Sequence, residues 1–215
     1  MHLEFLVEEE SAELALRNFL PRIIGDAASF DVHAFQGKSN LLGKLRQRLR
    51  GYRAWSPPDY RIVVIVDDDR QDCRQVKQEL EEAAHQAGLV TRTSAPQRGA
   101  FQVLNRIAIE ELEAWFFGDP EALVAAYPRV PPTIGSKSKY RNPDAIKGGT
   151  WEVLERVLQR AGYYPGGLPK REVARNISAH MQPERNTSRS FQVLRQALVQ
   201  ILDSPDDWHR ARRHF

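Results

Sequence analysis

The hydrophobic residues of the first 120 positions alternate between the spacing of a strand and the spacing of a helix. Some segments have an apolar residue at every second position or an unbroken apolar run, and the segments that follow them have apolar residues at helical spacing. The expected strands are residues 2–7, 29–35, 61–66, 89–94 and 101–109, and the expected helices are residues 10–23, 41–53, 72–87 and 110–117. Strands that alternate with helices predict an α/β fold with a mostly parallel, Rossmann-like sheet flanked by helices.

The segment Arg61–Val66 gives the strongest strand signal of the chain. Its last five residues are all β-branched and do not alternate with polar ones. Such a run is typical of a strand that is buried on both faces. We therefore expect 61–66 to lie in the interior of one sheet that also contains 2–7 and 101–109.

After residue 120 the strand signals end. The expected helices of this part are residues 121–127, 151–161, 171–181 and 190–202, and residues 128–149 form a loop rich in Pro, Gly and Lys. We therefore expect an α/β core of residues 1–125 and a helical C-terminal subdomain of residues 126–215.

The composition of the 215 residues excludes several classes of protein. The one cysteine, Cys73, excludes an internal disulfide and a zinc site built from cysteines. No apolar run approaches the ~20 residues of a membrane span, and the first residues lack the basic and apolar regions of a secretory signal. We therefore expect a cytoplasmic protein that does not associate with membranes.

The net charge of +3 is unevenly distributed along the chain. Residues 1–120 carry 15 Lys and Arg against 19 Asp and Glu, whereas residues 121–215 carry 16 against 9. This asymmetry fits a protein that holds cations in one part and polyanions in another. Chance variation among solvated faces would also produce it.

Acidic residues follow the strand 61–66 directly. In an open parallel sheet, ligands bind at the carboxyl ends of the strands, where Asp67, Asp68 and Asp69 stand. Strand alternation points Asp67 and Asp69 to the same side. Two converging carboxylates repel each other unless a cation or a proton is present, and their oxygens suit Mg²⁺ or Mn²⁺. The alternative is a turn that caps the next helix, although Asp72 alone could do this.

Two further acidic segments follow expected strands. Glu8 and Glu9 end the first strand and would join Asp67 and Asp69 if the two strands are neighbours; the alternative is an acidic helix start. In residues 110–117, we expect Glu110 and Glu113 to share a helix face, Leu112 and Trp115 to anchor the turn, and Glu111 to be solvated. Glu113 is the expected functional member, and a solvated helix face is the alternative. The candidate metal ligands are Glu8, Glu9, Asp67, Asp69 and Glu113, with Glu110 as the substitute for Glu113.

The motifs of other enzyme classes are missing from the chain. It contains no Walker A sequence, no G-x-G-x-x-G, no H-E-x-x-H and no G-x-S-x-G. A phosphatase that forms an aspartyl phosphate would carry its nucleophile on the first strand, and it would have Thr or Val where this chain has Gln71.

Together these segments resemble the Toprim domain. A Glu at the end of the first strand and a hydrophobic strand that ends in Asp-x-Asp mark that fold, which occurs in topoisomerases, primases and nucleases of the overcoming-lysogenisation-defect type. More closely, the chain resembles a bacterial Toprim-like family of unknown function, of the domain of unknown function 4276 type. The segments that carry the resemblance are LVEEESAE, FQGKSNLLGKL, VVIVDDDRQDC, AIEELEAWFFGD and the RSF of residues 189–191.

The resemblance implies a site for Mg²⁺ or Mn²⁺ built from Glu8, Asp67 and Asp69. The usual Toprim sequence is Val-Glu-Gly, whereas a second Glu follows Glu8 here, so the first-strand ligand is Glu8 or Glu9. Glu9 has Glu13 four residues later, which is the spacing at which nuclease relatives place a ligand of a second metal.

Basic residues provide a candidate nucleic-acid interface. The stretch from 38 to 53 contains no acidic residue and can follow a phosphate backbone, and Tyr140 of the long loop could stack on a base. A basic helix face that is merely solvated is the alternative. The expected nucleic-acid-binding residues are Lys38, Lys44, Arg46, Arg50, Lys137, Lys139 and Lys147.

These observations predict a metal-dependent nuclease. Two divalent ions about 3.5–4 Å apart can activate water and stabilise the leaving oxygen in phosphodiester cleavage, and the expected catalytic residues are Glu8, Asp67, Asp69 and Glu113. The resemblance implies a role in anti-phage defence or DNA repair beside a separate ATPase, because this chain has no ATPase motif. We also expect a homo-oligomer. Two alternatives stay open: another phosphoryl- or nucleotidyl-transfer enzyme, and a Toprim-like subunit that binds a partner without cleaving anything.

Overall fold

The computed structural model describes residues 1–68, 72–96 and 99–203, and these form an α/β protein built on one parallel sheet. The strands are β1 (His2–Val7), β2 (Ser29–Ala34), β3 (Tyr60–Asp67) and β4 (Val103–Ala108). Their order is β2-β1-β3-β4, and each pairs with its neighbour in parallel. The expected fold class is confirmed, and so is the interior position of β3, which pairs with β1 on one side and β4 on the other.

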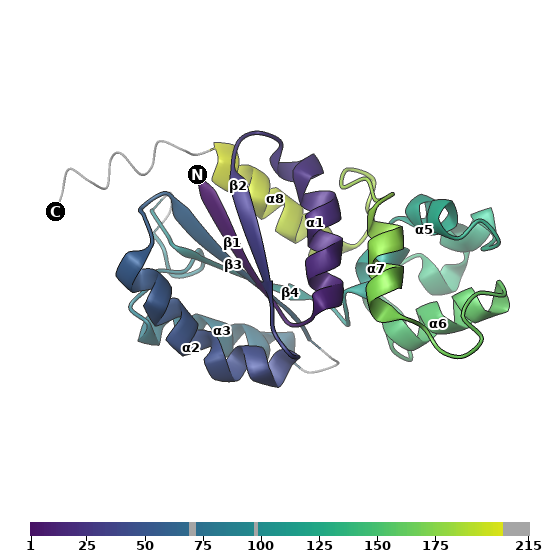
Figure 1. Cartoon of the computed structure of the whole chain (residues 1–215), viewed down its shortest axis with the longest axis horizontal. Coiled ribbons are helices and arrows are strands. Elements are labelled where there is room, and N and C mark those ends of the chain that lie inside the picture. Colours follow the sequence, from purple (N-terminus) through teal and green to yellow (C-terminus); the bar gives the residue numbers. More distant parts are fainter. Residues whose placement is uncertain (69–71, 97–98, 204–215) are drawn as a thin grey trace.

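Helices cover both faces of the sheet (Figure 1). Helices α1 (Glu10–Ile24) and α8 (Arg189–Asp203) pack on the face that buries Val63 and Ile65 of β3. Helices α2 (Lys38–Trp55) and α3 (Cys73–Gln86) pack on the face that buries Val64 and Val66. Alternate residues of β3 thus enter different cores, which is why its apolar run needs no polar positions.

The remaining helices lie beyond the carboxyl ends of the strands (Figure 1). They are α4 (Glu113–Phe117), α5 (Pro120–Ala126), α6 (Thr150–Arg160) and α7 (Lys170–Ser178), with short 3₁₀ turns at Pro132–Ser136, Ser138–Tyr140 and Pro143–Ala145. Helix α7 packs along α1, and α8 then returns to the sheet. One buried apolar cluster therefore runs from the sheet into the helical part. The division at residue 125 stays a prediction.

Two expectations about local structure were wrong. Residues 89–94 do not form a strand: one isolated bridge joins Thr91 to Val103, and a turn follows it. The helix expected at 110–117 is shorter, because α4 begins only at Glu113. None of the helices within the described residues is long and apolar enough to cross a membrane.

The connections after β1 and β3 leave the sheet in opposite directions. The chain passes from β1 to α1 on one face and from β3 to α3 on the other, and the two strands are neighbours. Such a reversal opens a crevice at the carboxyl ends of the two strands, where ligands bind in open α/β sheets. Glu8 follows β1, and Asp67 ends β3, so the candidate acidic residues stand at this crevice.

Candidate functional site

Glu8 and Asp67 are joined across the crevice. Glu8 is buried, and its Oε1 accepts a hydrogen bond of 2.9 Å from the backbone N–H of Asp67. Lys38, the first residue of α2, donates from its Nζ to the backbone oxygens of Asp67 (2.7 Å) and Asp68 (3.3 Å). The Glu8 backbone oxygen accepts from the N–H of Gly37 (2.8 Å), so the loop before α2 is fixed to the end of β1.

Asp68 fixes the connection between β4 and α4. It is buried, and its Oδ1 accepts a hydrogen bond of 2.8 Å from the backbone N–H of Glu110. Glu110 has a φ of 65°, a left-handed conformation that side chains other than Gly seldom adopt. The expectation that Glu110 and Glu113 share a helix face is therefore wrong, because the chain turns at Glu110 before the helix begins.

Glu113 is buried in the first turn of α4, with 5% of its surface exposed. Burial raises the pKa of its carboxyl to about 7, and the charge of Lys170 opposes part of this rise. Trp115, two residues later, is fully buried, and its indole N–H donates to the Ser190 hydroxyl (2.9 Å). Trp115 also packs edge-on against Phe191. The RSF segment therefore anchors the helix that carries Glu113.

Glu111 was expected to be solvated, and this was wrong. Its Oε2 accepts hydrogen bonds of 2.7 Å from the Thr150 hydroxyl and from the backbone N–H of Trp151. These donors belong to the first turn of α6, whose N–H groups have no partner within the helix. Glu111 thus ties the helical part to the crevice.

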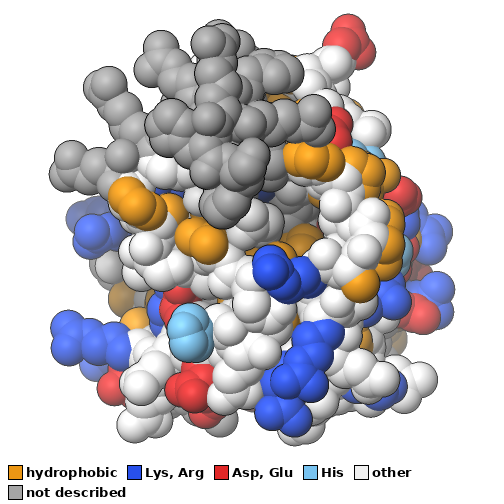
Figure 2. All heavy atoms as spheres, turned by 90° about the vertical axis from the view of Figure 1, so that its left-hand side faces the viewer, with side chains coloured by type: hydrophobic (Ala, Val, Ile, Leu, Met, Phe, Trp, Pro, Cys, Tyr) orange, Lys and Arg blue, Asp and Glu red, His pale blue; other side chains and the backbone are white. Residues whose placement is uncertain are grey.

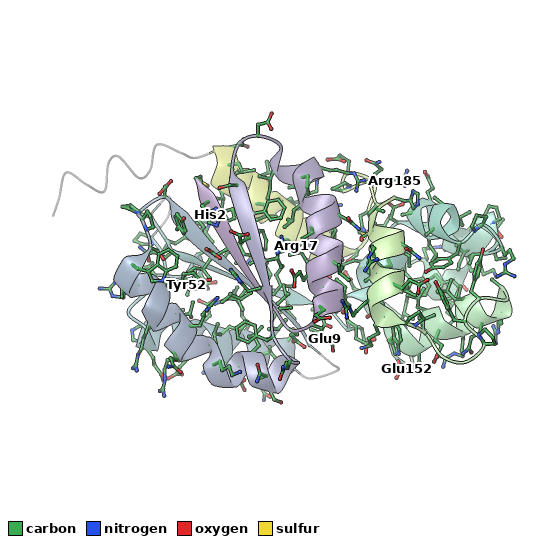
Figure 3. All side chains as sticks on the ribbon, viewed as in Figure 1. His2, Glu9, Arg17, Tyr52, Glu152 and Arg185 are labelled. Carbon is green, nitrogen blue, oxygen red and sulfur yellow. The ribbon has the colours of Figure 1, made fainter. Side chains whose placement is uncertain are left out.

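Lys170, the first residue of α7, brings a second cation to the site. Its Nζ lies 3.7 Å from Oε2 of Glu9, which stands beside α7 where α1 begins (Figure 3). Burial lowers the pKa of the Lys170 ammonium, but the charges of Glu113, Glu9 and two further carboxylates outweigh burial and raise it. Lys170 therefore stays protonated and offsets part of the negative charge of the crevice.

These side chains surround one cavity of about 170 Å³. Apolar residues from α1, β3 and β4 form part of its wall. The charged residues that line it are Glu8, Glu9, Lys38, Asp67, Glu111, Glu113 and Lys170. The structure thus brings together four of the five expected metal ligands. The fifth, Asp69, lies outside the described residues.

The donor chemistry of the cavity suits a hard cation, because carboxylate oxygens are the preferred ligands of Mg²⁺ and Mn²⁺. However, within residues 1–68, 72–96 and 99–203 no group of three or more Asp, Glu, His or Cys side chains could hold an ion. Glu8 faces the backbone of Asp67, whereas Glu9 is about half exposed and faces Lys170. The metal ligands, and the choice between Glu8 and Glu9, stay predictions.

The expected nucleic-acid-binding residues separate into two groups. Lys38 contacts the crevice instead of lying on an outer basic face. The others are exposed, on α2 (Lys44, Arg46 and Arg50) and in the long loop (Lys137, Lys139 and Lys147). Tyr140 is buried and stacks on Phe117, with ring centroids 5.1 Å apart and an interplanar angle of 10°. The expectation that Tyr140 stacks on a base is wrong, because its ring already has a partner.

Sequence reasoning missed Lys170 altogether. It stands 161 positions after Glu9, and no motif surrounds it. The only sequence signal is the basic excess of the second half of the chain. Its place in the crevice depends on the packing of α7 along α1, which no local pattern reveals.

Comparisons with known proteins give one result. Searches among curated proteins and among solved structures find no match to this chain. A family model matches residues 7–199, which include every described residue of the crevice. The resemblance to this family is confirmed, whereas the relation to Toprim domains stays a prediction. The chain belongs to the family described as Domain of unknown function (DUF4276).

Proposed function

We propose that this protein is a nuclease that cleaves phosphodiester bonds with the help of Mg²⁺ or Mn²⁺ bound at the crevice. The observation that carries the proposal is the cavity at the switch point of the sheet, where Glu8, Asp67 and Glu113 meet two lysines. Buried carboxylates destabilise a fold unless they are paired, and their convergence at a ligand-binding position favours a functional role over a structural one.

Each side chain has a role that its position supports. Glu8, Asp67 and Asp69 would hold the cation, with Glu113 or Glu9 completing the set. A bound divalent ion would lower the pKa of water and offset charge on the phosphate. The backbone N–H of Asp67 donates to Oε1 of Glu8. This hydrogen bond fixes that oxygen and orients the carboxylate.

The two lysines and Glu113 support chemistry on an anionic substrate. Lys38 and Lys170 both line the cavity and supply positive charge, which suits the extra charge that develops on a phosphate during cleavage. Glu113, with a pKa of about 7, can hold or release a proton at neutral pH. Such an activity fits the cytoplasm, where nucleic acid and Mg²⁺ occur together.

Partners of the nuclease are a further part of the proposal. A separate ATPase and a role in anti-phage defence or DNA repair follow from the resemblance to Toprim nucleases alone. A subunit that binds a partner without cleaving is the competing function, as is another phosphoryl-transfer enzyme.

A cleavage assay tests the proposal. The purified protein is incubated with supercoiled plasmid and with a labelled single-stranded oligonucleotide, in Mg²⁺, in Mn²⁺ and in EDTA. We expect cleavage with either metal and none in EDTA. Asp67→Asn should abolish cleavage and weaken Mn²⁺ binding in calorimetry, because it removes a ligand, while the variant stays folded because it also removes charge repulsion.

Asp72→Asn is the matched control. Asp72 lies five residues later and caps α3 by accepting a hydrogen bond from the N–H of Arg74 (2.9 Å), outside the cavity. Its variant should cleave as the unaltered protein does. Unchanged Mn²⁺ affinity in Asp67→Asn would refute the metal assignment, and a protein that binds Mn²⁺ but cleaves neither substrate would favour the non-catalytic function.

A further inference from the structure

A second, larger hollow lies along α2. It has a volume of about 630 Å³ and runs between α2 and the edge strand β2. From α2, a stripe at helical spacing lines it, from Lys44 through Arg48 to Trp55, and His33 and Phe35 line it from the end of β2. A volume of this size suits a small organic group such as a nucleotide base with its sugar.

The floor of this groove is aromatic. Trp55 is the most exposed of the large apolar side chains within the described residues, at 58%. Its ring lies 5.5 Å from Tyr52 and 5.8 Å from Tyr60, measured between centroids. The ring therefore contacts two aromatic neighbours, while more than half of the side-chain surface stays exposed. An exposed aromatic ring held in place by its neighbours is the usual platform on which unpaired bases stack.

The charge of the groove is positive at its rim. Lys44 and Arg48 are exposed there, and the Arg48 guanidinium lies over the Tyr52 ring, 5.4 Å from its centroid. Figure 2 faces the side of the molecule on which α2 ends, and basic side chains stand beside hydrophobic ones there. Alternating cationic and aromatic groups match the alternation of phosphates and bases along a single strand.

Among the described residues of the lining, the acidic one, Glu4, already has hydrogen-bond partners within the protein. Glu4 is buried, and its Oε2 lies within hydrogen-bond distance of His33 Nε2 (2.6 Å) and accepts from the Tyr52 hydroxyl (3.2 Å). Burial, with the charge of Glu4, raises the pKa of Tyr52 to about 12, so the phenol keeps its proton. Glu4 therefore fixes the side chains of the floor instead of meeting solvent.

The groove leads toward the crevice. Phe35 lines the groove, the N–H of Gly37 donates to the backbone oxygen of Glu8, and Lys38 lines the crevice. The stretch from Lys44 to Trp55 contains twelve residues, and its eleven helical steps span about 16 Å. The groove and the crevice thus share the loop between β2 and α2, and a strand that lies in one can reach the other.

We propose that the groove between β2 and α2 binds single-stranded nucleic acid, with an unpaired base on Trp55 and phosphates at Lys44 and Arg48. A duplex does not fit this role, because its bases are stacked on one another and offer only their edges to a protein. Binding in the groove stands independently of catalysis. Delivery of the strand to the crevice rests on the proposed nuclease function.

Helix α2 offers its own control. Arg46 and Arg50 lie on the opposite side of the helix from Lys44 and Arg48, and Arg46 donates to Gln86 of α3 (3.2 Å). The double variants Lys44→Ala/Arg48→Ala and Arg46→Ala/Arg50→Ala therefore remove the same charge from the same helix. All four residues are exposed, so both variants should keep their melting temperature.

The test is fluorescence anisotropy in EDTA with a labelled oligonucleotide of about 12 nucleotides, within the usual site sizes of single-strand binding folds. We expect Lys44→Ala/Arg48→Ala to weaken binding about tenfold or more, and the salt slope to fall by about 1.4, as for two lost phosphate contacts. Trp55→Ala should weaken binding about tenfold. The opposite-face variant should stay within about twofold, because neither Arg46 nor Arg50 lines the groove, although the sequence alone predicts that both bind nucleic acid. Unlabelled duplex of the same sequence should compete poorly.

Three results would overturn the groove proposal: equal losses in the two double variants, unaltered binding in Trp55→Ala, or competition by duplex as strong as by single strand. The cleavage assay separates this failure from that of the nuclease proposal. If the groove variants lose binding but the unaltered protein cleaves nothing in Mg²⁺ or Mn²⁺, the groove proposal stands and the nuclease proposal is refuted. If cleavage depends on Asp67 but the groove variants bind normally, the nuclease proposal stands and the groove proposal is refuted.

Discussion

The crevice and the groove share one loop, but their side chains come from the chain in different ways. The crevice is small, about 170 Å³, and charged residues from six separate elements or their ends converge on it. The groove is larger, about 630 Å³, and its side chains come mainly from one helix and the strand before it. Convergence from distant segments can fix a few atoms for chemistry, whereas one helix beside one strand offers an elongated surface for binding.

The electrostatics of the two hollows differ in the same way. In the crevice, burial raises the pKa of Glu113, and the nearby carboxylates outweigh burial and raise the pKa of Lys170. In the groove, the cations at the rim are exposed, so salt will screen their interactions with a ligand. Changes in the crevice should therefore alter turnover or stability, and changes in the groove should alter affinity.

The largest effect that sharpens this contrast is expected for Glu113→Gln. The folded protein binds the Glu113 proton more tightly than the unfolded chain, because the pKa rises from 4.5 to about 7. The unaltered protein should thus lose stability as the pH rises from below 4.5 through 7, by roughly 3 kcal/mol at most. The glutamine variant does not titrate there, so it should be the more stable protein at pH 8 in EDTA.

Thermal or urea unfolding of both proteins at pH 4 and pH 8 measures this difference. The advantage of the variant should grow across that interval and level off above pH 7. A constant difference at all pH values would mean that Glu113 is not a buried carboxyl with a raised pKa. The same variant should cleave nucleic acid poorly while it still binds the strand, since the groove is unaltered.

A comparison between Lys38 and Lys44 separates the two hollows on a single helix. Lys38→Met removes a cation that donates to the Asp67 and Asp68 backbone oxygens, and turnover should fall about 100-fold, as after the loss of one charge-stabilising donor. Lys44→Met should lower affinity for single strands a few-fold and leave turnover at saturating substrate unchanged. Steady-state kinetics of both variants measure turnover and affinity separately. Similar changes in the two variants would mean that the crevice and the groove do not have separate roles.

A smaller effect is expected for Lys170→Met. Its ammonium lies 3.7 Å from Glu9 and offsets the charge of the cavity, so the cleavage rate should fall about tenfold at neutral pH. Arg171→Met is the matched control, because the neighbouring Arg171 pairs with Glu10 (2.9 Å) where both side chains are mostly exposed. Such surface pairs contribute little, so this variant should keep its rate. Equal losses in both variants would assign the effect to the start of α7 as a whole.

Much of the fold followed from local patterns. The unbroken β-branched run of β3 required burial on both faces, and this placed the strand inside the sheet. The alternation of strands and helices indicated the parallel connections. The segment 89–94 shows the limit of such reasoning: its residues have strand propensity, but only Thr91 reaches a bridge with Val103. Propensity describes which backbone shape a residue tolerates, and pairing decides whether a strand forms.

The sequence by itself placed Glu8 and Asp67 at the carboxyl ends of two strands, and a parallel sheet brings such ends to one edge. The tertiary structure made these two strands neighbours. Only the tertiary structure decided that Glu111 ties down α6, that Tyr140 stacks on Phe117, and that Lys170 enters the crevice. The physical reason is the range of the interactions. Periodicity is set by neighbours within a few residues, whereas these contacts join segments between 23 and more than 100 positions apart, and depend on how whole helices pack.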